Sequence, residues 1–226
     1  MILLTAILLG LISGMVRAEL ERHPYRTLKL KKPGLVVVAF LAQFGVFQLS
    51  RFGLIIEDNW VAITLVTGQV ILLVFSYLNI KSPGFILLAF GTLLNLAVML
   101  LNGGLMPMSP ETISNLNPQV SPESWSIGER LGNSKNIALG EEMTRLSILS
   151  DRYILPGWLP YRVAFSLGDV VLSLGAFWLL WSLGGVPRKH KENTNGKKVT
   201  NHSPLRTDWR GSHRKGMQPD PDRGCD

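Results

Sequence analysis

Two carboxylates, Asp151 and Asp169, flank a short segment that leads into a long apolar stretch. An acid beside the mouth of a membrane span is costly unless it is paired, capped or used in chemistry. Two acids held close together repel, so that one keeps its proton at neutral pH, and such a pair can activate water and protonate a leaving amine. We therefore treat Asp151 and Asp169 as candidate catalytic residues of a hydrolase.

Each acid also has a structural interpretation. Ser166 lies three residues before Asp169 at the start of the apolar stretch, a spacing typical of a capping box, in which each side chain accepts a hydrogen bond from the backbone N–H of the other residue. The negative charge of Asp169 also suits the positive end of a helix. Asp151 stands beside Arg152, as a solvated loop acid would.

The elements that must position these acids are five apolar blocks, each near the roughly 20 residues that a helix needs to cross hydrocarbon. They lie at residues 1–16, 35–49, 60–77, 85–101 and 164–183. We predict an all-α integral membrane protein, with a bundle of about five transmembrane helices in residues 1–186 and an outer loop at 102–163. The first block lacks a basic leader and a small-residue cleavage site, which favours an uncleaved anchor.

The charges of the connecting segments predict their sides of the membrane. Residues 17–32 hold six Lys or Arg against two Glu, Lys81 lies in a short turn, and the tail after residue 187 holds ten Lys or Arg. Residues 50–59 and 102–163 carry no excess of basic residues. Because basic loops stay in the cytoplasm, we expect an outer N-terminus, a cytoplasmic C-terminus and both acids at the outer face of a plasma membrane.

The tail at residues 187–226 is basic and almost without apolar side chains, so we expect it to be disordered. Its charge suits anionic lipid headgroups better than nucleic acid, and we expect no nucleic-acid partner. The four histidines lie in basic segments and the single cysteine is Cys225, so we predict no metal site and no cofactor.

The outer loop divides into two parts. Residues 107–132 are rich in Pro, Ser and Asn and predict irregular chain. Residues 139–153 predict an amphipathic helix lying on the outer leaflet. The apolar residues at helical spacing there are Leu139, Met143, Leu146, Leu149 and Tyr153. Trp125, Trp158 and Tyr161 suit the same membrane interface.

Residues 102–107, Asn-Gly-Gly-Leu-Met-Pro, end the fourth block with the residue types that stop a helix, and the second glycine could instead let backbone line a cavity. The polar residues Gln43, Gln69 and Asn95 within the blocks would hydrogen-bond neighbouring helices or face such a site. Residues 31–34 and 81–84, Lys-Lys-Pro-Gly and Lys-Ser-Pro-Gly, fit either a parallel two-helix repeat or a common way to begin a helix.

Several of these motifs together resemble a bacterial family of multi-pass membrane proteins that is catalogued as a domain of unknown function. They are residues 102–107, Ser134-Lys135-Asn136, Asp151 and Phe165-Ser166-Leu167-Gly168-Asp169. The resemblance covers about residues 1–181 and implies a bacterial plasma-membrane location, without an activity. The candidate binding residues in or beside these motifs are Asn102, Gly103, Gly104, Pro107, Lys135, Asn136, Arg152 and Ser166.

The two acids are also similar in setting to those of lipoprotein signal peptidase, a bacterial aspartyl membrane protease. Asp151-Arg152 matches the end of its Asn-x-x-Asp-Arg motif, and Phe165 with Asp169 matches the frame of its Phe-Asn-x-Ala-Asp motif. Ile148 and Ser166 stand where that family has Asn, Gly168 replaces Ala, and five blocks replace four spans.

Three functions follow from these patterns. The first is a membrane protein without established chemistry that binds a lipid or a partner protein at its outer face. The second is an intramembrane aspartyl protease that uses Asp151 and Asp169. The third is a small membrane carrier built from the two-helix repeat.

Overall fold

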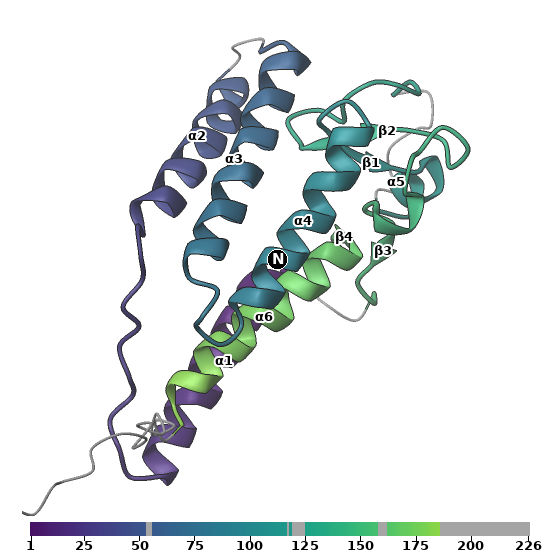
Figure 1. Ribbon diagram of the computed structural model, residues 1–226. Coiled ribbons are helices and arrows are strands. Elements are labelled where there is room, and N and C mark those ends of the chain that lie inside the picture. Colours follow the sequence, from purple (N-terminus) through teal and green to yellow (C-terminus); the bar gives the residue numbers. More distant parts are fainter. Residues whose placement is uncertain (53–55, 117, 119–124, 158–161, 186–226) are drawn as a thin grey trace, which may run out of the picture. The chain divides into compact units, whose positions relative to one another are not determined.

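In the computed structural model the described residues are 1–52, 56–116, 118, 125–157 and 162–185, and they lie in a unit that spans residues 1–187 (Figure 1). The predicted tail at 187–226, like Trp158 and Tyr161, lies outside the described residues. The described chain is mostly helical. Its helices are α1 (Ile2–Leu20), α2 (Gly34–Arg51), α3 (Asp58–Leu78), α4 (Phe85–Leu101), α5 (Pro110–Leu116) and α6 (Leu167–Leu183).

The five long helices lie where the apolar blocks predict them, with ends that differ by a few residues. Two of them, α1 and α3, are long and apolar enough to cross a membrane. The apolar helices at Gly34–Leu49, Phe85–Leu101 and Leu167–Leu183 are somewhat shorter.

Each long helix packs against the next in the order α1, α6, α4, α3, α2. A Cβ atom at Gly14 of α1 would lie 2.6 Å from the Leu180 carbonyl oxygen of α6. A Cβ atom at Gly91 of α4 would lie 2.8 Å from the Gly168 carbonyl oxygen. Glycine therefore lets three backbones approach, as small residues do between membrane helices.

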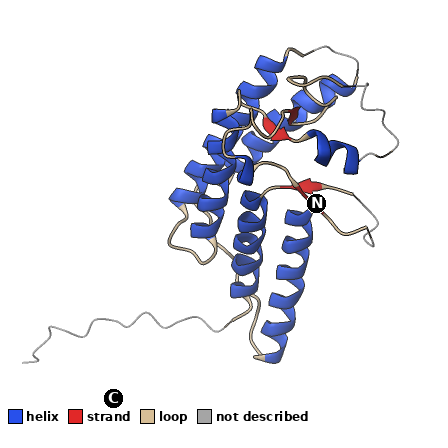
Figure 2. Cartoon of the chain, turned by 90° about the vertical axis from the view of Figure 1, so that its right-hand side faces the viewer, coloured by secondary structure: helices blue, strands red, loops and turns tan. Residues whose placement is uncertain are grey.

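The described residues between α4 and α6 form a structure that we call the cap (residues 102–116, 118, 125–157 and 162–166). Figure 2 shows its short strands among loops at one end of the long helices. Strand β1 (Met106–Met108) pairs in parallel with β2 (Asn136–Ala138), and β3 (Tyr153–Ile154) pairs antiparallel with β4 (Ala164–Phe165). The prediction of an all-α chain was therefore wrong in the cap.

Helix α5 also corrects the prediction of irregular chain at residues 107–132. Ser109 precedes this helix and its hydroxyl accepts a hydrogen bond from the Thr112 backbone N–H at 3.2 Å. A serine in that position satisfies one of the free N–H groups at a helix start, and Pro110 suits the first position of this short helix because it has no N–H to satisfy.

The amphipathic helix predicted at residues 139–153 was wrong. Turns, a 3₁₀ helix η2 (Ser147–Leu149) and β3 occupy this range, and Leu146 adopts a left-handed φ of 56°. The Asn102 side chain accepts a hydrogen bond from the Arg145 N–H and donates one to the Arg145 carbonyl, both at 2.9 Å. Because Asn102 uses both backbone groups of Arg145, they are not available for an α-helix.

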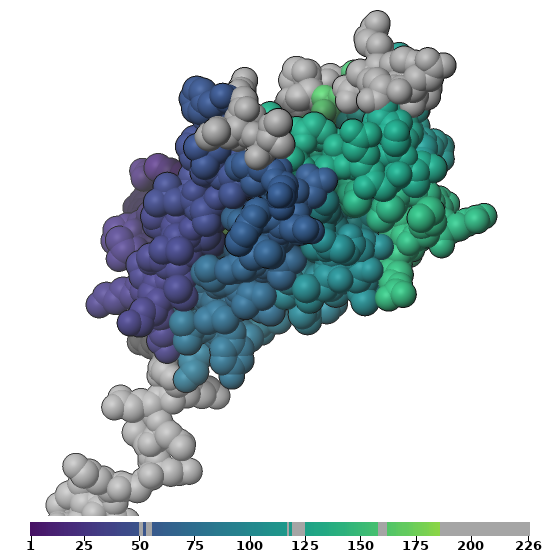
Figure 3. All heavy atoms as spheres, turned by 90° about the horizontal axis from the view of Figure 1, so that it is seen from above, coloured from purple at the N-terminus to yellow at the C-terminus, as the bar shows by residue number. Residues whose placement is uncertain are grey.

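Two apolar clusters hold the cap. Leu105 and Met106 of the cap are buried against α3 and α4. A second cluster lies within the cap around Met108, Ile113 and Ala138. At the start of α3, Arg130 of the cap pairs with Asp58 at 2.6 Å. Figure 3 shows the teal cap residues beside the blue residues of α3 on the face seen from above.

Candidate functional site

The centre of the candidate site is Asp151, which follows η2 and is only 1 % exposed. Its backbone N–H donates to the Pro107 carbonyl of β1 at 3.2 Å, which fixes the residue beside the first strand of the cap. A buried acid requires partners, because an isolated carboxylate loses its hydration in a protein interior.

Strand β2 supplies those partners. Met106 of β1 lies opposite Asn136, and the Met106 N–H donates to the Lys135 carbonyl at 2.9 Å. This register brings the Lys135 ammonium to 3.1 Å from Asp151 Oδ2 and the Asn136 amide to 2.8 Å from the same oxygen. Asp151 Oδ1 is buried and accepts no hydrogen bond from any described residue.

Burial raises the pKa of the Asp151 carboxyl, more than Lys135 lowers it, and the negative charge of Asp169 raises it further. Burial by itself would lower the pKa of Lys135, but the attraction of Asp151 and Asp169 exceeds this effect and raises it. The ammonium therefore stays charged and supports the ionised form of its carboxylate partner.

A second cluster surrounds Asp169 at the start of α6. Ser166 and Asp169 form the predicted capping box: the Ser166 hydroxyl accepts from the Asp169 N–H at 3.1 Å, and Asp169 Oδ2 accepts from the Ser166 N–H at 3.3 Å. Asn95 of α4 donates to Asp169 Oδ1 and accepts from the Ser166 hydroxyl, both at 2.9 Å. The capping box is thus confirmed, and it also joins α6 to the middle of α4.

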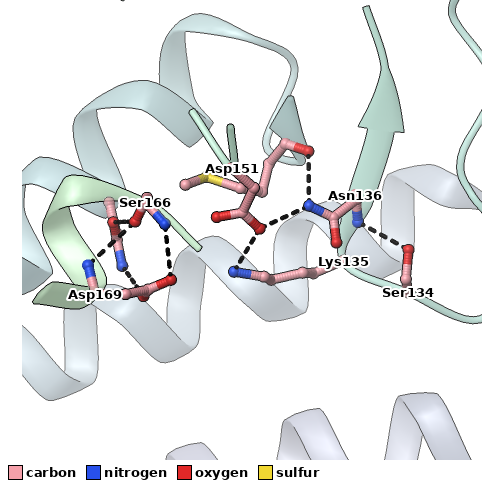
Figure 4. A network of polar contacts seen from close by, with 8 residues as sticks. Ser134, Lys135, Asn136, Asp151, Ser166 and Asp169 are labelled. Carbon is pink, nitrogen blue, oxygen red and sulfur yellow. Dashed lines mark hydrogen bonds and ion pairs between the residues drawn. The ribbon is translucent and has the colours of Figure 1, made fainter. Parts of the chain in front are cut away.

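The two clusters share an electrostatic neighbourhood. Figure 4 shows the Lys135 side chain reaching toward Asp151, with Ser166 and Asp169 nearby. The Asp169 charge acts on the pKa values of both Lys135 and Asp151. We call Lys135, Asn136, Asp151, Ser166, Asp169 and Asn95 the polar network.

The polar network borders a cavity of about 250 Å³ between α2, α3, α4 and the cap. Lys135, which contacts Asp151, and Asn95, which contacts Asp169, both face this cavity, together with Gln43 and Gln69. We call it the amide pocket. Its remaining lining is Phe47, Leu65, Met99, Met106, Asn133 and Ser134.

The chemistry available to the acids is restricted by these contacts. In a paired-acid hydrolase, two carboxyls act on one water or share one proton. Both oxygens of Asp169 accept hydrogen bonds from the chain, and Asp151 Oδ2 is held by Lys135 and Asn136. This arrangement favours a polar network that shapes a pocket over a pair of free catalytic acids.

Several predicted binding residues lie apart from the network. Arg152 pairs with Glu141 at 3.2 Å on an exposed surface, and Asn102 orders the chain at Arg145. Gly103 has φ of 78° with open space around it, as expected for a helix stop. Gly104 has φ of 85°, and a Cβ there would lie 2.7 Å from the Ala62 side chain, so it provides close packing on α3.

The sequence alone did not show that the side-chain carboxamides of three helices face the same cavity as Lys135. Gln43, Gln69 and Asn95 were recognisable as polar residues inside apolar blocks, and this was the signal that could have located the pocket.

The two copies of the suspected repeat begin helices differently. Gly84 is left-handed and lies against α6, whereas Gly34 has open space around it, which favours a common helix start over a repeat.

The fold and site define a mostly helical protein with a buried charged network between a helix bundle and a small cap. The chain belongs to a family described as a family of unknown function (DUF5317), whose model matches residues 27–181. An uncharacterized protein of Thermotoga maritima is 28 % identical over 178 residues, which cover 78 % of this chain and 86 % of that protein. No solved structure matches.

The family match confirms the resemblance to a domain of unknown function. The similarity to lipoprotein signal peptidase around Asp151 and Asp169 finds no support in these comparisons.

Proposed function

We propose that this protein is a multi-pass protein of the bacterial plasma membrane that binds an amphiphilic ligand at its outer face. The ligand's polar group occupies the amide pocket and its apolar part follows the surrounding helices.

The observation that carries the membrane assignment is the exposure of large apolar side chains on the long helices. Phe40 of α2 is 62 % exposed, Ile63 of α3 is 54 % exposed and Ile86 of α4 is 65 % exposed. Many other Leu, Ile, Val and Phe side chains on the same helices are similarly exposed. Soluble proteins rarely expose so many large apolar side chains on helices that pack together, whereas hydrocarbon is a suitable solvent for them.

Charged residues at the helix ends support the orientation. Arg17, near the end of α1, lies 4.4 Å from the ring centre of Trp181 near the end of α6. Arg26 donates to carbonyls at the end of α6. Basic and aromatic side chains together suit the cytoplasmic interface. Glu57 and Asp58 lie at the start of α3, the end that the proposed orientation puts at the outer face.

The pocket supports binding of an amphiphile because it joins polar groups to an apolar environment. Gln43, Gln69 and Asn95 come from three helices whose outward faces are apolar. At about 250 Å³ the pocket has the size of a headgroup rather than of a drug-sized ligand. A molecule with one polar end and one apolar end satisfies both surroundings.

The test uses the full chain, produced in a bacterium and purified in a detergent without a sugar head. We expect it in the membrane fraction after a carbonate wash, and we expect a bound lipid detectable by native mass spectrometry. Gln69→Leu should reduce lipid occupancy, while Gln48→Leu, on α2 outside the pocket lining, should leave it unchanged. Recovery in the soluble fraction contradicts the membrane assignment, and equal occupancy in both variants contradicts the pocket.

A further inference from the structure

The charges around the amide pocket bear on the class of its ligand, a question that rests on the function proposed above. Lys135 is the charged side chain among the described lining residues. Its ammonium is neutralised by Asp151 at 3.1 Å, and Asp169 contributes a second negative charge to the same network. With both acids ionised the network carries one more negative than positive charge, which disfavours an anionic group such as a phosphate.

The side-chain carboxamides of the pocket favour recognition by hydrogen bonds rather than by charge. Gln43 and Gln69 are half-buried, and their side chains make no hydrogen bond with a described residue. Each offers an N–H₂ donor and a carbonyl acceptor to the pocket. Anions need donors only and ammonium groups need acceptors only, whereas a hydroxyl group donates and accepts at once. An amide lining therefore matches hydroxyl groups best.

The fold also positions these amides. A Cβ atom at Gly68 would lie 2.2 Å from the Gln43 Nε2 atom, so the absence of a side chain at Gly68 lets Gln43 lie across α3. Asn95 is oriented by its two bonds, because its amide nitrogen donates to Asp169 and its amide oxygen accepts from the Ser166 hydroxyl. Gly68 thus leaves room for Gln43, and hydrogen bonds hold Asn95.

We propose that the amide pocket binds an uncharged, hydroxyl-rich group, such as the sugar of a glycosyl diacylglycerol. The carboxamides exchange hydrogen bonds with its hydroxyls, and Phe47 offers an apolar face to the ring. The Lys135–Asp151 pair borders the ligand as a neutralised pair and contributes no net attraction for anions.

The test compares lipids with identical acyl chains on the purified full chain, in a detergent without a sugar head, by native mass spectrometry. The probes are monoglucosyl diacylglycerol, diacylglycerol and phosphatidylglycerol. We expect the glucosyl lipid to bind about tenfold more tightly than the other two, the effect of one or two well-placed hydrogen bonds. Gln69→Leu and Gly68→Ala should each remove this preference, and Gln48→Leu should retain it.

Competition with methyl glucoside distinguishes a free sugar from the sugar headgroup of a lipid as the ligand. Displacement of the glucosyl lipid by methyl glucoside supports recognition of the sugar alone, and its failure to displace supports recognition of sugar and acyl chain together. Tighter binding of phosphatidylglycerol that Gln69→Leu abolishes overturns the uncharged headgroup but leaves the proposed function intact. The absence of binding by all three lipids, with a normal unfolding transition, overturns both.

Discussion

The Lys135 ammonium lies 3.1 Å from a carboxylate oxygen of Asp151, a residue that is 1 % exposed. The side chain of Lys135 is itself 38 % exposed, toward the amide pocket. One pair therefore links the interior of the cap to the surface where the ligand is proposed to bind.

Removal of one partner from this pair should destabilise the protein. Lys135→Met leaves the buried Asp151 carboxylate with Asn136 as its remaining partner. We expect a loss of about 2–3 kcal/mol in the free energy of unfolding. This loss is smaller than for a completely buried pair because Lys135 is partly exposed. The double variant Lys135→Met/Asp151→Leu should lose less than the sum of the two single variants. Additive losses, measured by denaturant unfolding in detergent, would show that the pair is not coupled.

The pH dependence of stability should report the raised pKa of Asp151. A folded-state pKa above the ordinary value of 3.8 means that the folded chain holds its proton more readily than the unfolded chain. The contribution of Asp151 to stability should therefore be largest at low pH, decrease as the pH rises through the raised pKa, and then stay constant. Asp151→Asn does not titrate and serves as the reference. A stability difference that instead grows with pH would mean that the ion pair outweighs burial.

Asp169 should act mainly through the cap of α6. Asp169→Ala removes the acceptors for Asn95 and for the Ser166 N–H, and we expect a loss of about 2 kcal/mol. Asp169→Asn retains one acceptor oxygen and should lose about half as much. Thermal unfolding gives the ranking, and a lipid-binding assay gives function. If the Asn variant were as stable as wild type but inactive, the carboxyl itself would be essential, as acid–base chemistry requires.

Gly14 should set the distance between α1 and α6. Gly14→Ala places a methyl group near the Leu180 carbonyl oxygen, where backbone must move, and we expect a loss of about 1–3 kcal/mol. The matched control is Gly45→Ala on α2, where a Cβ meets no atom within 4 Å. There the better helix propensity of Ala should keep or raise the unfolding temperature. Equal effects of the two substitutions would contradict close packing at Gly14.

The sequence predicted best those features that depend on neighbours in the chain. The apolar blocks predict the long helices because burial or lipid contact requires continuous apolar stretches. The spacing of Ser166 and Asp169 predicts the capping box because both partners lie within one helical turn. Gly103 was likewise predictable as a helix stop.

Features that depend on distant segments were not predictable in the same way. The pairing of β1 with β2 places Lys135 beside Asp151, and three-residue strands leave almost no periodic signal. The leucine spacing at residues 139–153 suggested a helix, but Asn102, some forty residues earlier in the chain, uses the Arg145 backbone instead. In both cases a long-range hydrogen bond decides the local structure.

The central claim is a membrane protein whose cap faces outward, and single-cysteine labelling of intact cells tests it most directly. In a Cys225→Ser background, the exposed residues Ser126 in the cap and Lys81 between α3 and α4 are each replaced by cysteine. A membrane-impermeant maleimide should label Ser126→Cys in intact cells and Lys81→Cys only after the cells are opened. Labelling of Lys81→Cys but not Ser126→Cys in intact cells would contradict the proposed orientation and the outward-facing cap.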